Sequence, residues 1–231
     1  MADNEQVRAD YVSEEVISQL GGDDILKFRD IQDPHDFIFK NCYTLDPHDE
    51  YSAIKLIPDH TYLHVIVDEW LANKQLLIVK SRQMMITWLM CAIHLWDSMI
   101  HRGRVAFLVS KNENDANYSR ELSLLSRVSF MYDKLPEHYR KQSYCVKTLK
   151  PACFKFPKMD SAIYGMSQDS DALRQYTATS VFWDEMAFHE HAYSAYAAVK
   201  PTLMGGGRLC GVSTPNGKNN LFFDLATNTK K

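Results

Sequence analysis

Two adjacent carboxylates, Asp184 and Glu185, follow the short apolar run SVFW and are the side chains of this sequence best suited to catalysis. An apolar strand that ends in two acidic residues is the Walker B pattern. In it, the first carboxylate holds Mg²⁺ and the second polarises an attacking water. Acidic pairs after apolar residues are common, so this pair gains meaning only if a phosphate-binding loop lies elsewhere in the chain.

A candidate for that loop is Lys80–Thr87, between an apolar run and a helical pattern. The order strand, loop, helix presents backbone N–H groups and a helix N-terminus to a phosphate. The window keeps only the final Thr87 of the motif G-x-x-x-x-G-K-[ST]. Lys80 stands at the first glycine, Met85 at the second and Ile86 at the lysine. Alone, the window fits a buried strand that feeds an amphipathic helix better than a phosphate loop. Beside the acidic pair, Thr87 becomes the natural hydroxyl ligand of Mg²⁺.

The elements that must position these residues follow from periodicity. Short apolar runs alternate with helical patterns, which predicts an α/β domain with a largely parallel central sheet flanked by helices. The predicted strands are Leu76–Val79, Val105–Val109, Cys153–Phe156, Ala162–Tyr164, Thr179–Trp183 and Leu209–Val212. The predicted helices are 5–20, Thr61–Asn73, Thr87–His101, Asn112–Met131 and His191–Leu203, the last of which Pro201 should end early. Residues 23–59 are expected to form short helices and loops.

Ligands of parallel sheets lie beyond the carboxyl ends of the strands. Three polar stretches follow predicted strands, namely Lys80–Thr87, Asp184-Glu185 and Ser213-Thr214. We therefore expect these stretches to meet at one edge of the sheet.

Charge is distributed unevenly along the chain. Residues 1–60 carry 14 acidic and 5 basic side chains, whereas residues 102–158 carry 12 basic and 5 acidic ones. The basic segment suits contact with nucleic acid phosphates and equally suits a solvated surface. The five cysteines are scattered without a C-x-x-C pair, which favours reduced thiols in the cytoplasm and no zinc site. No apolar run is long enough to span a membrane, and the acidic N-terminus is no signal peptide.

Three segments together resemble the large terminase subunits of tailed bacteriophages and their herpesvirus relatives. SRQMMITW at 81–88 resembles the family's S-R-Q-x-G-K-T loop, and ALRQYTATSVFWDEMAF at 172–188 resembles its Walker B segment. GVSTPNGKNNLFF at 211–223 resembles its coupling motif. The motifs are individually loose, but their order and spacing are specific.

The resemblance implies an ASCE-type P-loop NTPase fold and an ATP-driven motor that moves double-stranded DNA into a procapsid through the portal. It implies ATP and Mg²⁺ as cofactors. The expected partners are duplex DNA, the portal protein, the small terminase subunit and further copies of this chain in a ring. The expected location is the host cell cytoplasm, transiently docked on the procapsid and without a membrane. Residues 1–59 would form an N-terminal lobe and residues 60–231 the ATPase core. The family's nuclease domain would be absent from this fragment.

The resemblance also assigns roles to single residues. Glu185 would be the catalytic base, while Thr87 and Asp184 would hold the metal. Arg174 would be an arginine finger that acts on a neighbouring subunit, although the family's following glycine is Gln175 here. The nucleotide would be held by Lys80, Ser81, Arg82, Gln83, Met84, Met85, Ile86 and Thr87, with Ser213 and Thr214 sensing the γ-phosphate.

Departures from the family pattern leave two questions open. Because Ile86 replaces the loop lysine, either Arg82 or Lys80 must supply the missing cation. Met85 in place of glycine also limits how closely the backbone can approach a phosphate. Two alternatives therefore remain, a helicase-like nucleic-acid-dependent ATPase and a non-catalytic module whose loop has decayed.

Overall fold

The computed structural model describes residues 31–46, 49, 51–168, 173 and 177–227. Its centre is a seven-stranded sheet with the strand order β3-β9-β8-β4-β7-β6-β5. The first five strands in this order are mutually parallel, whereas β6 runs antiparallel to both of its neighbours. The strands are β3 (Gln75–Val79), β4 (Val105–Ser110), β5 (Val146–Leu149), β6 (Ala152–Phe156), β7 (Ser161–Ser167), β8 (Ser180–Asp184) and β9 (Arg208–Ser213).

The predicted α/β class and largely parallel central sheet are confirmed. Each predicted strand begins and ends within one residue of the observed strand, except that β7 runs on to Ser167, three residues past its predicted end. The strand β5 was missed because VKTL is short and alternates between exposed and half-buried side chains. Its partner is the neighbouring strand β6, with which it forms an antiparallel pair at the end of the sheet.

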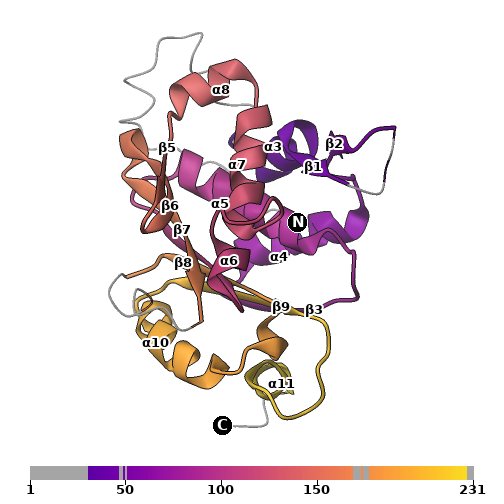
Figure 1. Cartoon of the computed structure of the whole chain (residues 1–231), viewed down its shortest axis with the longest axis vertical. Helices are drawn as coiled ribbons and strands as arrows, with labels where there is room; N and C mark the ends of the chain where they lie inside the picture. Colours follow the sequence, from indigo (N-terminus) through magenta and orange to yellow (C-terminus); the bar gives the residue numbers. More distant parts are fainter. Residues whose placement is uncertain (1–30, 47–48, 50, 169–172, 174–176, 228–231) are drawn as a thin grey trace, which may run out of the picture.

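Helices cover both faces of the sheet (Figure 1). One face packs against α3 (Pro34–Asn41), α4 (Thr61–Ala72), α5 (Ile86–Ile100) and α7 (Leu124–Lys134), and the other against α10 (Ala192–Met204) and α11 (Leu221–Thr227). Strand side chains alternate between the two cores. In β4, Leu108 belongs to the first core and Phe107 to the second. The result is a three-layer domain.

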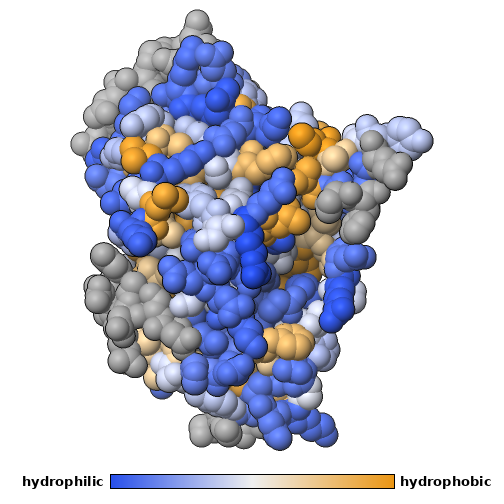
Figure 2. Space-filling model, viewed as in Figure 1, coloured by the Kyte–Doolittle hydropathy of each residue, from blue (hydrophilic) through white to orange (hydrophobic). Residues whose placement is uncertain are grey.

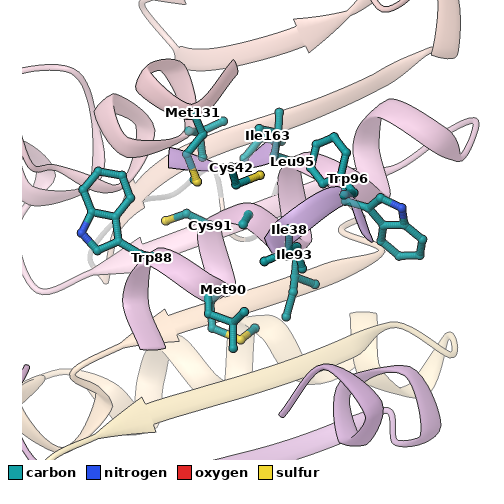
Figure 3. Close-up of a cluster of buried hydrophobic side chains, with 14 of the residues drawn as sticks. Ile38, Cys42, Trp88, Met90, Cys91, Ile93, Leu95, Trp96, Met131 and Ile163 are labelled. Atoms are coloured by element: carbon teal, nitrogen blue, oxygen red, sulfur yellow. The ribbon is translucent and has the colours of Figure 1, made fainter. Parts of the chain in front are cut away.

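The helix α5 is the centre of the larger core (Figure 3). Every residue of this helix except Thr87 is buried. A helix that is apolar on all sides must be surrounded by other elements, and the side chains drawn in Figure 3 come from α5 and from its neighbours. Thr87 in the first turn is therefore the position where α5 keeps a polar, accessible face.

The segment before the sheet differs in part from the prediction. The helix α3 begins at Pro34, and the Asp33 carboxylate caps it by accepting a hydrogen bond from the His35 N–H at 2.9 Å. A two-stranded antiparallel pair follows, β1 (Tyr43–Leu45) and β2 (Ile54–Leu56), in place of the expected short helices and loops. The predicted helix 5–20 lies outside the described residues.

The predicted helix Asn112–Met131 is wrong. Two helices, α6 (Glu113–Ala116) and α7, are separated by an irregular stretch. Short polar side chains satisfy the backbone there, because the Asn117 Oδ1 accepts from the Ser119 N–H at 2.7 Å. Gly165 of β7 lets α6 lie against the sheet, since a Cβ at this position would stand 2.3 Å from the Ala116 carbonyl oxygen.

The expectation that Pro201 ends its helix early is also wrong. The helix α10 continues through Pro201 to Met204, and the Gly205 N–H donates to the Pro201 carbonyl oxygen at 3.0 Å. The remaining helical elements are α8 (Glu137–Gln142), the 3₁₀ turns η2 (Pro157–Met159) and η3 (Met186–Phe188). Within the described residues, no helix has the length and apolar character needed to cross a bilayer.

Candidate functional site

Strand β9 lies between β3 and β8, so the three predicted polar stretches, Lys80–Thr87, Asp184-Glu185 and Ser213-Thr214, meet at one edge of the sheet. Val79 pairs with Ser213 in the β3–β9 register, and Asp184 pairs with Val212 in the β8–β9 register. The Lys80 N–H extends the ladder by donating to the Ser213 carbonyl oxygen at 3.0 Å. The strand ends therefore stop at the same level, and the residues that follow them face one another.

Thr87 and Asp184 are in direct contact across this edge. The Thr87 hydroxyl donates to the Asp184 carboxylate, with Oγ1 at 3.1 Å from Oδ1 and 3.4 Å from Oδ2. These two residues start α5 and end β8, respectively. The contact joins the first turn after the loop to the first acidic residue of the Walker B pattern.

Lys80 and Glu185 form the second contact between the two segments. The Lys80 ammonium lies 2.6 Å from the Glu185 Oε1, and the Lys80 side chain is only 8% exposed. Thus the lysine at the beginning of the loop, although it replaces the first glycine of the motif, carries its charge into the site.

The other oxygen of Glu185 is held by the end of β9. Its Oε2 accepts hydrogen bonds from the Thr214 N–H at 3.2 Å, the Thr214 hydroxyl at 3.3 Å and the Ser213 hydroxyl at 3.4 Å. The Ser213 Oγ in turn accepts from the Ala187 N–H in η3 at 3.1 Å. Glu185 is therefore fixed from both sides.

Three residues at this edge adopt the left-handed backbone region, which favours glycine. Their φ values are +48° at Glu185, +56° at Met85 and +61° at Gln83. Met85 stands where the motif has its second glycine, and its backbone adopts a conformation that a non-glycine side chain disfavours. Strain of this kind is concentrated at functional sites.

The rest of the loop divides into an exposed and a buried half. Ser81, Arg82 and Gln83 are exposed, whereas Met84 and Met85 pack against the core. Ile86, at the lysine position of the motif, is only 3% exposed. Its side chain is part of the core and has no access to the site. Outside the loop, the Tyr62 hydroxyl donates to the Met84 carbonyl oxygen at 3.2 Å.

A pocket of about 490 Å³ opens at this edge, between the strand ends and the segment that leads into α7. Figure 2 shows a largely hydrophilic surface around α6, which lies near the middle of the same view in Figure 1. The pocket is lined by both carboxylates of the acidic pair and by four basic residues: Arg82, Lys111, Arg120 and Arg127. A cavity with this lining suits a ligand that carries several negative charges and a cation.

The two carboxylates of the acidic pair are tuned in opposite directions. Burial raises the pKa of Asp184 to about 6, against smaller opposing effects of Arg127 and Lys80. Burial alone would raise the pKa of Glu185 as well, but hydrogen bonds from Lys80 and Thr214 outweigh it and the pKa lies below the ordinary value. At neutral pH, Glu185 is therefore firmly ionised, whereas the ionised form of Asp184 is destabilised by burial.

The Thr87–Asp184 contact fits a magnesium ion. Hydroxyl and carboxylate oxygens are its preferred ligands, and Mg²⁺ commonly takes only one or two protein carboxylates beside phosphate oxygens and water. A divalent cation would also offset the cost of the buried Asp184 charge. Among the described residues there is no cluster of three or more His, Cys, Asp or Glu that could hold a metal without a ligand's help.

Three basic residues of the pocket were not predicted from the sequence, and one predicted site residue has no described position. Arg127, Arg120 and Lys111 line the pocket, but they belong to no motif, and only their place in the basic segment 102–158 could have indicated them. Arg174 lies outside the described residues.

Comparison with known proteins bears on the fold. No family model matches the sequence, and no characterised protein matches it at the sequence level. The ATPase domain of the Thermus phage P74-26 large terminase superimposes with a TM-score of 0.57 and 19% identity over 74% of this chain and 69% of that one. A point mutant of the same domain gives 0.57 and 18%, over 74% and 70%.

The HK97 bacteriophage large terminase gives a TM-score of 0.62 and 12% identity, over 87% of this chain but only 42% of that one. The TM-scores establish a shared fold, although the sequence identities are low. The chain shares the fold of the terminase ATPase domains, as the resemblance of its motifs led us to expect, and β9 lies between the strand before the loop 80–87 and the strand that ends in Asp184.

Proposed function

We propose that this chain is the ATPase domain of a viral DNA-packaging motor of the large terminase type. The observation that carries the proposal is the meeting of Lys80, Thr87, Asp184, Glu185 and Thr214 at one sheet edge, in a fold shared with terminase ATPase domains. Hydrolysis of ATP would drive double-stranded DNA through the portal into a procapsid.

In this proposal the phosphates bind to the loop 80–87 and to the N-terminus of α5. Lys80 supplies the cation that Ile86 cannot, because its ammonium already lies inside the site while Ile86 belongs to the core. Arg82 lines the pocket from the exposed half of the loop and adds a second charge. Mg²⁺, when bound between Thr87 and Asp184, supplies charge neutralisation of the phosphate oxygens.

Glu185 acts as the base that orients and deprotonates the attacking water. Its lowered pKa keeps it ionised and able to accept a hydrogen bond from that water at neutral pH. In the present arrangement Oε1 is occupied by Lys80. A phosphate that attracts the Lys80 ammonium would therefore release one oxygen of Glu185 for water, so that nucleotide binding and base activation become one event.

Ser213 and Thr214 couple the site to the rest of the domain. Both donate to the Glu185 carboxylate, and the Ser213 Oγ accepts from the Ala187 N–H. Asn216 also donates to the Ala187 carbonyl oxygen at 3.0 Å. A movement of Glu185 on hydrolysis would thus shift β9, η3 and the loop between β9 and α11 through these hydrogen bonds.

The proposal extends to parts of the motor that the described residues do not include. Arg174 would reach the nucleotide of a neighbouring copy in a ring on the portal, and the small terminase subunit would be a further partner. The chain would work in the host cell cytoplasm, docked transiently on the procapsid. Residues 1–59 would form a lobe on the ATPase core of residues 60–231.

The two alternatives rest on specific observations. A helicase-like ATPase would share the fold and the site. A decayed loop is favoured by Ile86, which is buried, and by Met85, which occupies a glycine conformation. Against decay stands the complete set of contacts among Lys80, Thr87 and the acidic pair.

The proposal is tested by measuring phosphate release from Mg-ATP by this chain, with and without duplex DNA. We expect hydrolysis that duplex DNA stimulates, together with no separation of strands in a fluorescent unwinding assay. Strand separation would favour the helicase alternative. Absence of both ATP binding by calorimetry and hydrolysis, at millimolar ATP and at protein concentrations that allow ring assembly, would favour the decayed module.

A further inference from the structure

Arg127 is a cation of the site that no sequence motif indicates. It lies on α7 and lines the pocket together with Arg82, Asp184 and Glu185. Its charge reaches the acidic pair, because it opposes the rise in the pKa of Asp184 that burial causes.

The guanidinium of Arg127 is held in place by stacking. Its central carbon lies 5.2 Å from the centre of the Trp88 ring. Trp88 follows Thr87 in the first turn of α5 and is itself fixed by Phe130, whose ring meets it edge-on at 5.9 Å. A guanidinium on an aromatic face keeps its plane, so that less conformational freedom is lost when its N–H groups bind a ligand.

Two other cations of the pocket already have carboxylate partners. Arg120 is paired with Asp115, and Lys111 lies 3.2 Å from a Glu190 oxygen. Arg127 forms no ion pair with any residue that the structure describes, and its Nε is buried without a hydrogen-bond partner. A buried donor without an acceptor destabilises the protein, and an anionic ligand in the pocket would supply that acceptor.

We propose that Arg127 binds the terminal phosphate of ATP and so distinguishes ATP from ADP. The inference rests on the proposed ATPase function and adds a residue to it. The loop 80–87 would hold the nucleotide, and Arg127 lines the same pocket as Asp184 and Glu185. That is where the γ-phosphate, the metal and the attacked bond are expected. The flat fork of an arginine suits two oxygens of one phosphate.

The test compares ATP with ADP in a protein that cannot hydrolyse. In the Glu185→Gln background, Mg-ATP and Mg-ADP affinities are measured by calorimetry for the parent and for Arg127→Ala. We expect ATP to bind at least ~10-fold more weakly to the variant, since a hydrogen bond to a charged group contributes on the order of that factor. ADP affinity should change less than about 3-fold, because ADP lacks the phosphate in question.

Lys134→Ala is the matched control, because Lys134 is an exposed basic residue in the last turn of the same helix. It should leave both affinities unchanged. Arg127→Gln keeps much of the length of the side chain without its charge and should show the same selective loss, which guards against a folding defect in the alanine variant.

The outcomes separate the two proposals. If the parent binds ATP and both Arg127 variants bind it equally well, the role of Arg127 is overturned while the ATPase proposal stands. Equal weakening of ATP and ADP would mean that Arg127 only supports the fold, and this also overturns the inference. A parent that binds neither nucleotide overturns both proposals together.

Discussion

The Lys80 ammonium lies 2.6 Å from the Glu185 carboxylate and joins two segments that are 105 residues apart in the chain. The lysine is nearly enclosed, and its partner is more than a third exposed. A charge placed in this way has two uses. In the proposed function, Lys80 would keep the Glu185 base ionised before a nucleotide binds, and its ammonium would move to a phosphate once one binds.

Replacement of Lys80 by alanine should abolish most of the ATPase activity. The charge that would stabilise the β- and γ-phosphates is lost, and we expect kcat/KM for Mg-ATP to fall by roughly 100-fold or more. Steady-state phosphate release measures this. Lys74→Ala, which removes an exposed lysine just before β3, should retain full activity. Equal activity of the Lys80 and Lys74 variants would show that Arg82 alone replaces the loop lysine.

Glu185→Gln should separate binding from hydrolysis. Loss of the base lowers kcat by about 10²–10⁴-fold, the usual contribution of general-base catalysis, while the amide preserves the shape of the side chain. Mg-ATP affinity, measured by calorimetry, should stay within a few-fold of the parent. Loss of binding together with hydrolysis would contradict the assignment of Glu185 as the base.

Asp184→Asn should raise stability above pH 6 in the absence of metal. The folded protein holds a proton on Asp184 up to a pKa of about 6, against an ordinary value of 3.8. Between these values the folded state binds more protons than the unfolded state, so this group's contribution to stability falls as pH rises from about 4 to 6.

At pH 7.5, with a chelator present, we therefore expect the Asp184→Asn variant to unfold with a free energy about 2–3 kcal/mol higher than the parent. At pH 4 the difference should vanish. Urea titrations at both pH values test it, with the surface change Asp133→Asn as the control. A variant less stable than the parent at pH 7.5 would mean that the Asp184 charge is already compensated within the protein.

Met85→Gly should tighten ATP binding, because the backbone can then approach a phosphate more closely, and it should cost less stability than Met84→Gly, since both side chains pack against the core. A non-glycine residue in the left-handed region is strained by about 1–2 kcal/mol, and relief of that strain offsets the greater unfolded-state entropy of glycine, about 0.5–1 kcal/mol. Met84→Gly is the control, since Met84 has no such strain to relieve and should only destabilise. Calorimetry and thermal unfolding report the two effects separately.

Gly165→Ala should destabilise the domain by about 1–3 kcal/mol, as overpacking of a core does. The new methyl group would meet the Ala116 carbonyl oxygen, which the backbone of α6 fixes in place. Gly211→Ala is the comparison, because its Cβ would meet the side-chain ends of Met186 and Leu77. These ends can move, so the second variant should lose less stability in urea unfolding.

The parallel strands and their polar ends could be predicted from the sequence, because a buried strand in such a sheet is an apolar run and its end is marked by a change to polar residues. Asp184 and Ser213 were found in this way. The break between α6 and α7 could not, since the apolar spacing continues through 117–123 and only the local hydrogen bonds of Asn117 and Ser123 interrupt it.

The partners of the site residues were harder to predict than their positions. Lys80 stood at a position that the motif reserves for glycine, so its pairing with Glu185 appears only when β3 and β8 are brought to either side of β9. Arg127 carried no signal beyond its charge, because its place in the pocket depends on the packing of α7 against Trp88. Contacts between segments that are distant in the chain depend on the order of the strands in the sheet, which the local sequence pattern does not give.

The place of β9 has a consequence for the newly made chain. The strand that separates β3 from β8 is the last of the sheet to leave the ribosome, and it brings Ser213 and Thr214 with it. Until then the loop and the acidic pair have no common neighbour to align them, and the facing edges of β3 and β8 lack a hydrogen-bonding partner. Under the proposed function, a chain that ends before β9 would hold the loop 80–87 and the acidic pair without the strand that aligns them, and it would not hydrolyse ATP.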